Sequence, residues 1–186
     1  MRTIGRMSKN KGANYERKIA KDLSKWWGGT FSRVPASGGL HWGSDQRVAG
    51  DIVPPPEVDF PFVVECKKRE EWVMDHIVLD IGQPREWWAQ VVMDGRRVHR
   101  TPIMFFSRNH AKDFVMAPYS EELYTLLKEN ATDVMVAPVT IENIRKEIQQ
   151  FEVIVTTFDT LSKLPIDTVR KYGKEVQWDP YRDKYE

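Results

Sequence analysis

Apolar side chains recur at intervals of three and four residues in the first part of the chain, which is the pattern of an amphipathic helix. These positions are Ile19, Ala20, Leu23 and Trp27. With Ser8 or Asn10 as its cap and Gly28-Gly29 as its stop, we predict a helix from about Lys11 to Trp27. Glu16 continues the apolar face one turn back, and a carboxylate at the edge of such a face is costly unless something holds it there.

Short apolar runs bounded by Pro and Gly come next, and we expect them to form strands. They lie at about 30–34, 51–53, 62–67, 102–106 and 114–117, and the last two form a hairpin around 107–112. A loop rich in Pro, Ser and Gly spans 35–50. Prolines at 54–56 stop the second run and Pro61 opens the third, as expected where a residue cannot donate to a sheet.

A second helix is predicted from about Pro84 to Met93, with Pro in its first turn and Gly95 just beyond its end. Trp87 and Trp88 differ by about 100° around this helix. We therefore expect one indole in the core, while the other stacks on DNA, pairs across a dimer or lies partly exposed.

The remaining chain alternates between the two kinds of pattern. Helices are expected at 120–129, 141–149 and 159–172, strands at 134–136 and 151–157, and a frayed end at 179–186. Helices that alternate with strands in this order predict an α/β fold, with a mixed sheet flanked by helices.

Composition narrows the classes of protein to which the chain can belong. The 186 residues fit one domain, and no apolar run is long enough to cross a membrane. The basic N-terminus lacks the apolar core of a secretory signal. Cys66 is the single cysteine, which excludes an internal disulfide and a cysteine-based zinc site. We expect an intracellular, cytoplasmic protein.

The formal net charge of +1 conceals an uneven distribution. Residues 1–50 hold ten Lys and Arg against three acidic residues, so the other 136 residues carry 18 basic and 24 acidic ones. A basic N-terminal block on a near-neutral chain suggests a one-sided surface for a polyanion. A solvated basic helix face is an equally good interpretation of the same charges.

The chemistry is concentrated in Asp51 and in the segment Glu65-Cys66-Lys67. Side chains alternate between the faces of a strand, so Glu65 and Lys67 share one face while Cys66 packs into the core on the other. Asp51, at the start of a neighbouring strand, reaches the same place. Two carboxylates beside a lysine form a site of oxygen ligands suited to Mg²⁺, which activates water and stabilises charge on a phosphate.

The pattern Glu-x-Lys is common by itself, and Glu16-Arg17-Lys18 repeats it on the predicted first helix. The alternative interpretation is a strand that ends in solvent, with Glu65 and Lys67 simply exposed. The four histidines show no spacing typical of metal ligands, and we expect structural or surface roles for them.

Four segments together resemble the PD-(D/E)XK nuclease superfamily, and in order and spacing they are similar to archaeal-type Holliday junction resolvases and their phage-encoded relatives. The segments are KGANYERKIAKDL, RVPASGG, GDIV and VVECK, within residues 9–117. The resemblance implies a restriction-endonuclease-like fold. The chain departs from the superfamily at Gly50, which stands where Pro is frequent.

The resemblance also implies roles for individual residues. Asp51 and Glu65 would bind metal, Glu16 would add a further acidic group to the metal site, Lys67 would act on the water, and Ser37 would lie near the scissile phosphate. Gln90 on the second helix either reaches this site, as a glutamine does in related nucleases, or faces solvent. The residues expected to contact DNA are Lys9, Lys11, Lys18, Arg33, Ser37, Gly38 and Lys68.

These expectations combine into a Mg²⁺-dependent endonuclease, with Mn²⁺ as a substitute metal, that acts as a homodimer on four-way DNA junctions. We expect one domain over 1–186, with a nuclease core at 9–117 and an extension at 118–186 to which no role is assigned. Two alternatives stay open at this point. They are a sequence-specific or repair endonuclease of the same fold, and a non-catalytic DNA-binding module.

Overall fold

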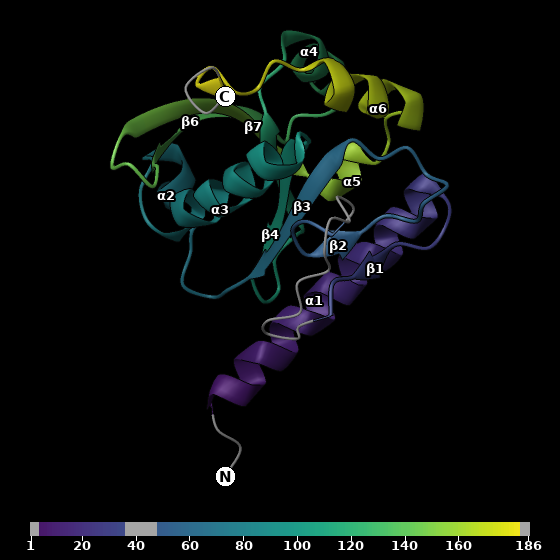
Figure 1. Cartoon of the computed structure of the whole chain (residues 1–186), viewed down its shortest axis with the longest axis horizontal. Helices are drawn as coiled ribbons and strands as arrows, with labels where there is room; N and C mark the ends of the chain where they lie inside the picture. The colour runs from purple at the N-terminus through teal and green to yellow at the C-terminus, as the bar shows by residue number, and fades with distance from the viewer. Residues whose placement is uncertain (1–3, 36–47, 183–186) are drawn as a thin grey trace.

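The structure, a computed structural model, describes residues 4–35 and 48–182 and has the predicted α/β architecture (Figure 1). A mixed sheet is flanked by helices on both faces, consistent with a restriction-endonuclease-like fold. The helices are α1 (Ile4–Trp27), α2 (Met74–Val78), α3 (Gln83–Val98), α4 (Glu121–Asn130), α5 (Phe158–Leu161) and α6 (Ile166–Glu175). The strands are β1 (Ser32–Arg33), β2 (Ile52–Val53), β3 (Phe62–Lys68), β4 (Thr101–Ser107), β5 (Phe114–Pro118), β6 (Val134–Glu142) and β7 (Ile148–Thr157).

The main sheet has five strands in the order β3-β4-β5-β7-β6. β3 and β4 are parallel and are joined through α2 and α3, whereas β4–β5, β5–β7 and β6–β7 are antiparallel. β1 and β2 form a separate antiparallel pair beside β3, and Gly50 makes a parallel bridge to Val64. This bridge ties the β1–β2 pair to the strand that carries Glu65.

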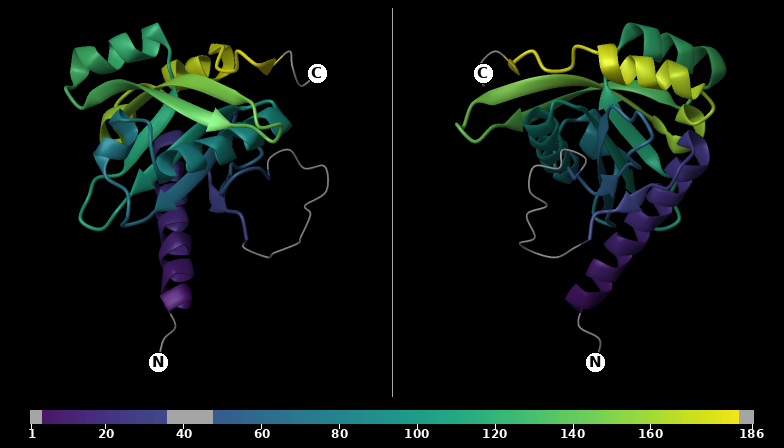
Figure 2. Two further views of the ribbon diagram at one scale, coloured as in Figure 1. Left: turned by 90° about the vertical axis from the view of Figure 1, so that its left-hand side faces the viewer. Right: turned by 45° about the vertical axis from the view of Figure 1, so that its right-hand side comes forward.

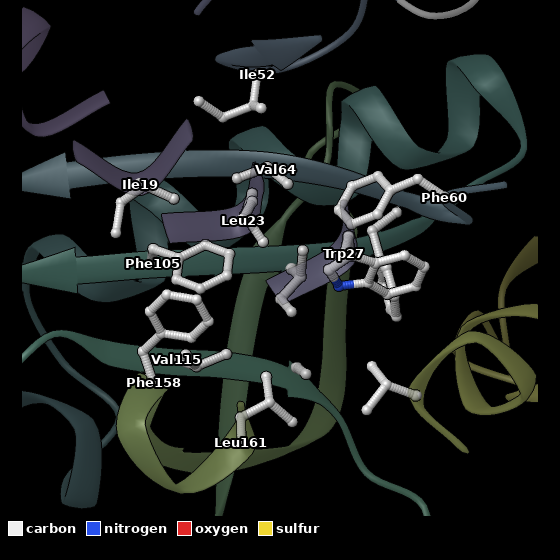
Figure 3. Close-up of a cluster of buried hydrophobic side chains, with 14 of the residues drawn as sticks. Ile19, Leu23, Trp27, Ile52, Phe60, Val64, Phe105, Val115, Phe158 and Leu161 are labelled. Atoms are coloured by element: carbon white, nitrogen blue, oxygen red, sulfur yellow. The ribbon is translucent and has the colours of Figure 1, made fainter. Parts of the chain in front are cut away.

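Each face of the sheet has its own apolar core. One core joins β3–β5 and β7 to α1, α4, α5 and α6, and Figure 3 shows Leu23 of α1 next to Val64 and Trp27 next to Phe60. The other core joins the sheet to α2 and α3. β3 is apolar on both faces over its first half, as expected of a strand covered by helices on both sides.

The predicted first helix is confirmed but begins earlier, at Ile4, and Figure 2 shows its first turns projecting beyond the body of the molecule. It ends at Trp27 as predicted, where Gly28 adopts a φ of 79°. The hairpin of β4 and β5 and the helix α4 are also confirmed. No helix of the described residues is long and apolar enough to cross a lipid bilayer.

Two expectations for the second helix are wrong. Trp87 and Trp88 are both buried, at 7% and 0% exposure, because α3 packs against the sheet and also against α2, which covers more than one of its faces. Gly95 lies inside α3, which ends at Val98 and is followed by the C-cap residue His99 with a φ of 53°. A Cβ at Gly95 would lie 2.8 Å from the Arg100 carbonyl oxygen, so the glycine is needed for close packing and not to end the helix.

The helix expected at 141–149 is also wrong, because this segment is the turn of the β6–β7 hairpin. The side chain of Asn143 accepts hydrogen bonds from the backbone N–H groups of Arg145 and Glu147, and Lys146 adopts a φ of 64°. These features belong to a tight turn, not to a helix. The helix expected at 159–172 is divided into α5 and α6, with Pro165 immediately before α6.

Candidate active site

Asp51 is held in place by the backbone on both sides of it. Its N–H donates to the Val64 carbonyl at 2.7 Å, and its own carbonyl accepts from the N–H of Val34 at 2.8 Å. Its Oδ2 accepts from the N–H of Cys66 at 2.7 Å. Asp51 is therefore fixed against β3 by two hydrogen bonds, one through its main chain and one through its side chain.

Gly50 makes this approach to β3 possible. Its φ of 69° lies in the left-handed region, and a Cβ there would lie 2.3 Å from the Val64 carbonyl oxygen. Proline cannot take this conformation, because its ring fixes φ near −65°. Gly50 therefore stands where the superfamily often has proline because only glycine allows the chain to approach β3 so closely in this conformation.

Glu65 and Lys67 project from the same face of β3, as predicted. The Glu65 side chain is 1% exposed and the Lys67 side chain 17% exposed, so the alternative of a charged strand end in solvent is wrong. Lys67 Nζ lies 2.5 Å from Glu65 Oε1. Glu65 Oε1 is thus paired with the Lys67 ammonium, whereas Oε2 is buried and accepts no hydrogen bond from the described residues. Asp51 and Glu65 bring two buried negative charges against the one positive charge of Lys67, so the site has room for a further cation.

α3 supplies two further side chains to this site. Lys67 Nζ donates to Gln90 Oε1 at 3.1 Å, so Gln90 reaches the site and does not merely face solvent. Asp94 lies one turn further along the same helical face. Its negative charge acts on both Asp51 and Glu65, although its own ion pair is with Arg97 at 3.3 Å.

Sequence reasoning did not identify Asp94. Its spacing of four residues from Gln90 is the one signal that would have pointed to it.

Glu16 lies on α1 and is bound by an arginine. Its Oε2 accepts from Arg33 Nε of β1 at 2.8 Å, and both side chains are about one-fifth exposed. Its charge nevertheless contributes to raising the pKa of Asp51, so Glu16 belongs to the electrostatic surroundings of the site. Arg33, which we expected to contact DNA, holds the carboxylate at the edge of the apolar face of α1.

Burial raises the pKa of both central carboxyl groups, and nearby negative charges add to the effect. For Asp51 burial is the main cause, partly offset by the hydrogen bond from Cys66 N–H. For Glu65 burial again comes first, followed by the charge of Asp51, and the Lys67 ammonium acts in the opposite direction. Burial also raises the pKa of the Cys66 thiol well above its usual value, so this cysteine is not an activated thiolate.

These residues suit a hard divalent cation. Such a cation would neutralise the two carboxylates whose pKa values burial raises, and it would use the free acceptor capacity of Glu65. Among the described residues, no group of three or more His, Cys, Asp or Glu is arranged to hold a metal without other ligands. Two carboxylates completed by waters and a substrate phosphate are the arrangement typical of Mg²⁺.

The other residues expected to bind DNA are dispersed. Lys9 is exposed, whereas Lys11 pairs with Glu70 and Lys18 pairs with Asp22 and Asp113. Lys68 Nζ lies over the Tyr15 ring at 5.8 Å from its centroid, near the site. Ser37 and Gly38 lie outside the described residues.

Comparison with models of known protein families gives a match over most of the chain. A sequence model of the phage putative PDDEXK endonuclease family matches residues 7–171. The match extends well beyond the segments that carry the resemblance, and it includes β6, β7 and α5. No protein with a curated description and no solved structure matches the chain significantly.

Proposed function

Because the chain belongs to this family of phage PDDEXK endonucleases, and is thus a nuclease of the PD-(D/E)XK superfamily, we propose that it is a Mg²⁺-dependent endonuclease that resolves four-way DNA junctions as a homodimer. The observation that carries the chemistry is the buried Glu65 carboxylate, which pairs with Lys67 through Oε1 and accepts no hydrogen bond from the described residues at Oε2. A purely DNA-binding module has no use for so costly a group.

Asp51 and Glu65 would hold the metal ion, and Mn²⁺ would substitute for Mg²⁺. When bound, Mg²⁺ polarises a phosphate oxygen and lowers the pKa of water. Lys67 orients the attacking water and offsets the negative charge that develops on the phosphate. Gln90 keeps the Lys67 ammonium directed at this point, and the Cys66 N–H keeps Asp51 in place.

The choice of a branched substrate rests on the resemblance of the helix-one and RVPASGG segments to junction resolvases. A four-way junction needs two cuts, and a two-fold dimer places two active sites at symmetric positions on two of its arms. We expect paired nicks near the branch point and preferential binding to the junction over linear duplex in competition.

Cleavage of a synthetic four-way junction, a flap and a linear duplex, measured side by side on gels, tests both parts of the proposal. Asp51→Asn and Glu65→Gln should each abolish cleavage in Mg²⁺ and leave junction binding within a few-fold. Wild-type turnover by either variant would refute the metal site. A monomer that cuts junction and duplex equally would refute junction resolution alone, and cuts at one duplex sequence would favour the sequence-specific alternative.

A further inference from the structure

Two arginines, Arg69 and Arg108, lie side by side at the ends of β3 and β4. Each is the first residue after its strand. The two strands are parallel, with Lys68 opposite Ser107, so both end at the same edge of the sheet (Figure 1). The backbone N–H of Arg69 donates to the Ser107 carbonyl at 3.1 Å, which holds the two ends together. Arg69 and Arg108 are called the arginine pair below.

The arginine pair lies close to the proposed catalytic lysine. The guanidinium of Arg108 is 5.9 Å from the centre of the Trp72 ring, and Trp72 belongs to the core between the sheet and α2 and α3. Gln90 of α3 contacts Lys67 from this same side of the sheet. Lys67 comes two residues before Arg69, which is about 7 Å along an extended chain.

Among the described residues, no carboxylate forms an ion pair with either guanidinium of the arginine pair. Arg69 uses Nη1 to donate to a backbone carbonyl at 3.2 Å, and Arg108 contacts the face of an aromatic ring. The adjacent carboxylate has other partners, because Glu70 pairs with Lys11 and accepts from the N–H of Asn109 at 3.0 Å. Both guanidinium groups therefore keep N–H donors for an anion.

Trp72 fixes the position of Arg108 without using its hydrogen-bond donors. The indole is 1% exposed, and its Nε1 donates to the Ser107 carbonyl at 3.1 Å. A cation over the face of an aromatic ring is attracted by the ring electrons, so the N–H groups in the guanidinium plane stay available. An arginine that is already held in place loses less conformational freedom when it binds a ligand.

We propose that the arginine pair binds a backbone phosphate of DNA next to the scissile phosphate. The planar donors of a guanidinium match the oxygens of a phosphate, and two of them at one edge of the sheet give a site for a single anionic group. The ion pair of Lys11 with Glu70 brings α1 beside this site, and the chain has no acidic residue before Glu16. The identity of the phosphate as part of a DNA substrate rests on the proposed function.

The test compares three double variants. Arg69→Gln/Arg108→Gln removes both charges of the pair, and Arg69→Lys/Arg108→Lys keeps them. The control Lys146→Gln/Lys171→Gln removes two charges from exposed side chains that are paired with glutamates elsewhere. Binding of a four-way junction and of a linear duplex is measured by fluorescence anisotropy at several salt concentrations. EDTA is present throughout, so the measurement does not depend on cleavage.

In the glutamine variant of the arginine pair, the slope of log affinity against log salt should become less steep by about 0.9 for each lost phosphate contact. The change should appear with both DNAs, because a backbone contact does not depend on branching. The lysine variant should recover most of the slope, which a mere loss of packing on Trp72 would not allow. The control should keep the slope of the wild type.

The proposal is overturned if the glutamine variant keeps the slope of the wild type, or if the lysine variant loses as much of it as the glutamine variant. Thermal denaturation shows whether each variant is folded, and Arg108→Gln alone gives the same comparison if the double variant unfolds. Cleavage in Mg²⁺ separates this proposal from the proposed function. A protein that cuts DNA with an unchanged slope loses only the phosphate site, and one whose slope changes as expected but which never cuts loses only the nuclease activity.

Discussion

Replacing Gly50 with alanine should change the position of Asp51 in the proposed active site without removing any of the proposed reacting groups. The alanine Cβ would lie 2.3 Å from the Val64 carbonyl oxygen and 3.0 Å from Val63 Cγ1, and the left-handed φ of 69° would be strained as well. Because ordinary contacts begin near 3.4 Å, residue 50 must move away from β3 by about 1 Å. Asp51 follows directly and must move with it.

The expected magnitude has two parts. The left-handed conformation costs about 1–2 kcal/mol for a residue with a Cβ. Weakening the hydrogen bond from Asp51 N–H to Val64 adds about 0.5–1.5 kcal/mol, so the free energy of unfolding should fall by about 1.5–3.5 kcal/mol. A displacement of 1 Å in a catalytic group lowers turnover by about 100-fold, and we expect at least that loss.

Gly28→Ala is the matched control. Gly28 has a φ of 79°, but a Cβ there meets nothing within 4 Å, so only the conformational cost of about 1–2 kcal/mol applies. Urea denaturation gives the free energies of unfolding, and single-turnover junction cleavage in Mg²⁺ gives the rates. If folded Gly50→Ala protein cuts as fast as Gly28→Ala, the close approach to β3 does not position Asp51 and the reasoning fails.

Two further predictions concern the charges at the site. Lys67→Ala should lower the rate of single-turnover cleavage by about 100-fold or more, which is the range seen when a transition-state stabiliser is lost. Gln90→Ala should cause a smaller loss, because the Lys67 ammonium remains. Equal losses in the two variants would contradict the positioning role of Gln90. The pKa values of Asp51 and Glu65 are raised in the folded, metal-free protein, which therefore binds more protons than the unfolded chain. The resulting contribution to the free energy of unfolding is present below about pH 4. It is lost as the pH rises through the raised pKa values of the folded protein. In thermal denaturation without metal, the stability of Asp51→Asn should therefore fall less steeply with rising pH than that of the wild type. Parallel curves for the two proteins would show that burial does not raise the pKa of the Asp51 carboxyl group.

The features that sequence reasoning predicted well are those set by local periodicity. Glu65 and Lys67 share a face because side chains alternate along any strand, whatever lies beside it. The end of α1 at Trp27 was predicted equally well, because it is determined locally by the glycines at 28 and 29 that follow it. The burial of both tryptophans on α3 could not be predicted from the sequence. It depends on a tertiary contact, in which α2 covers a second face of the helix.

The hairpin turn at 143–147 shows why the later part was harder to predict. Ile141, Ile144 and Ile148 recur at the spacing of a helix, yet Ile144 and Ile148 are 77% and 65% exposed. The conformation of residues 141–149 is determined by the pairing of β6 with β7, which the spacing of apolar residues does not reveal. The contribution of Asp94 to the site was missed for a similar reason, because the packing of α3 over β3 brings it there.

The position of β7 between β5 and β6 has a consequence for the time course of synthesis. A ribosome completes β3, β4 and β5 well before β7, so until residue 157 has emerged the edge of β5 presents unpaired N–H and C=O groups. The sheet that contains β3, the strand with Glu65 and Lys67, is therefore completed only late in translation. A chain that ends before residue 157 lacks the strand that pairs with β5, so we expect such a fragment to aggregate and not to fold.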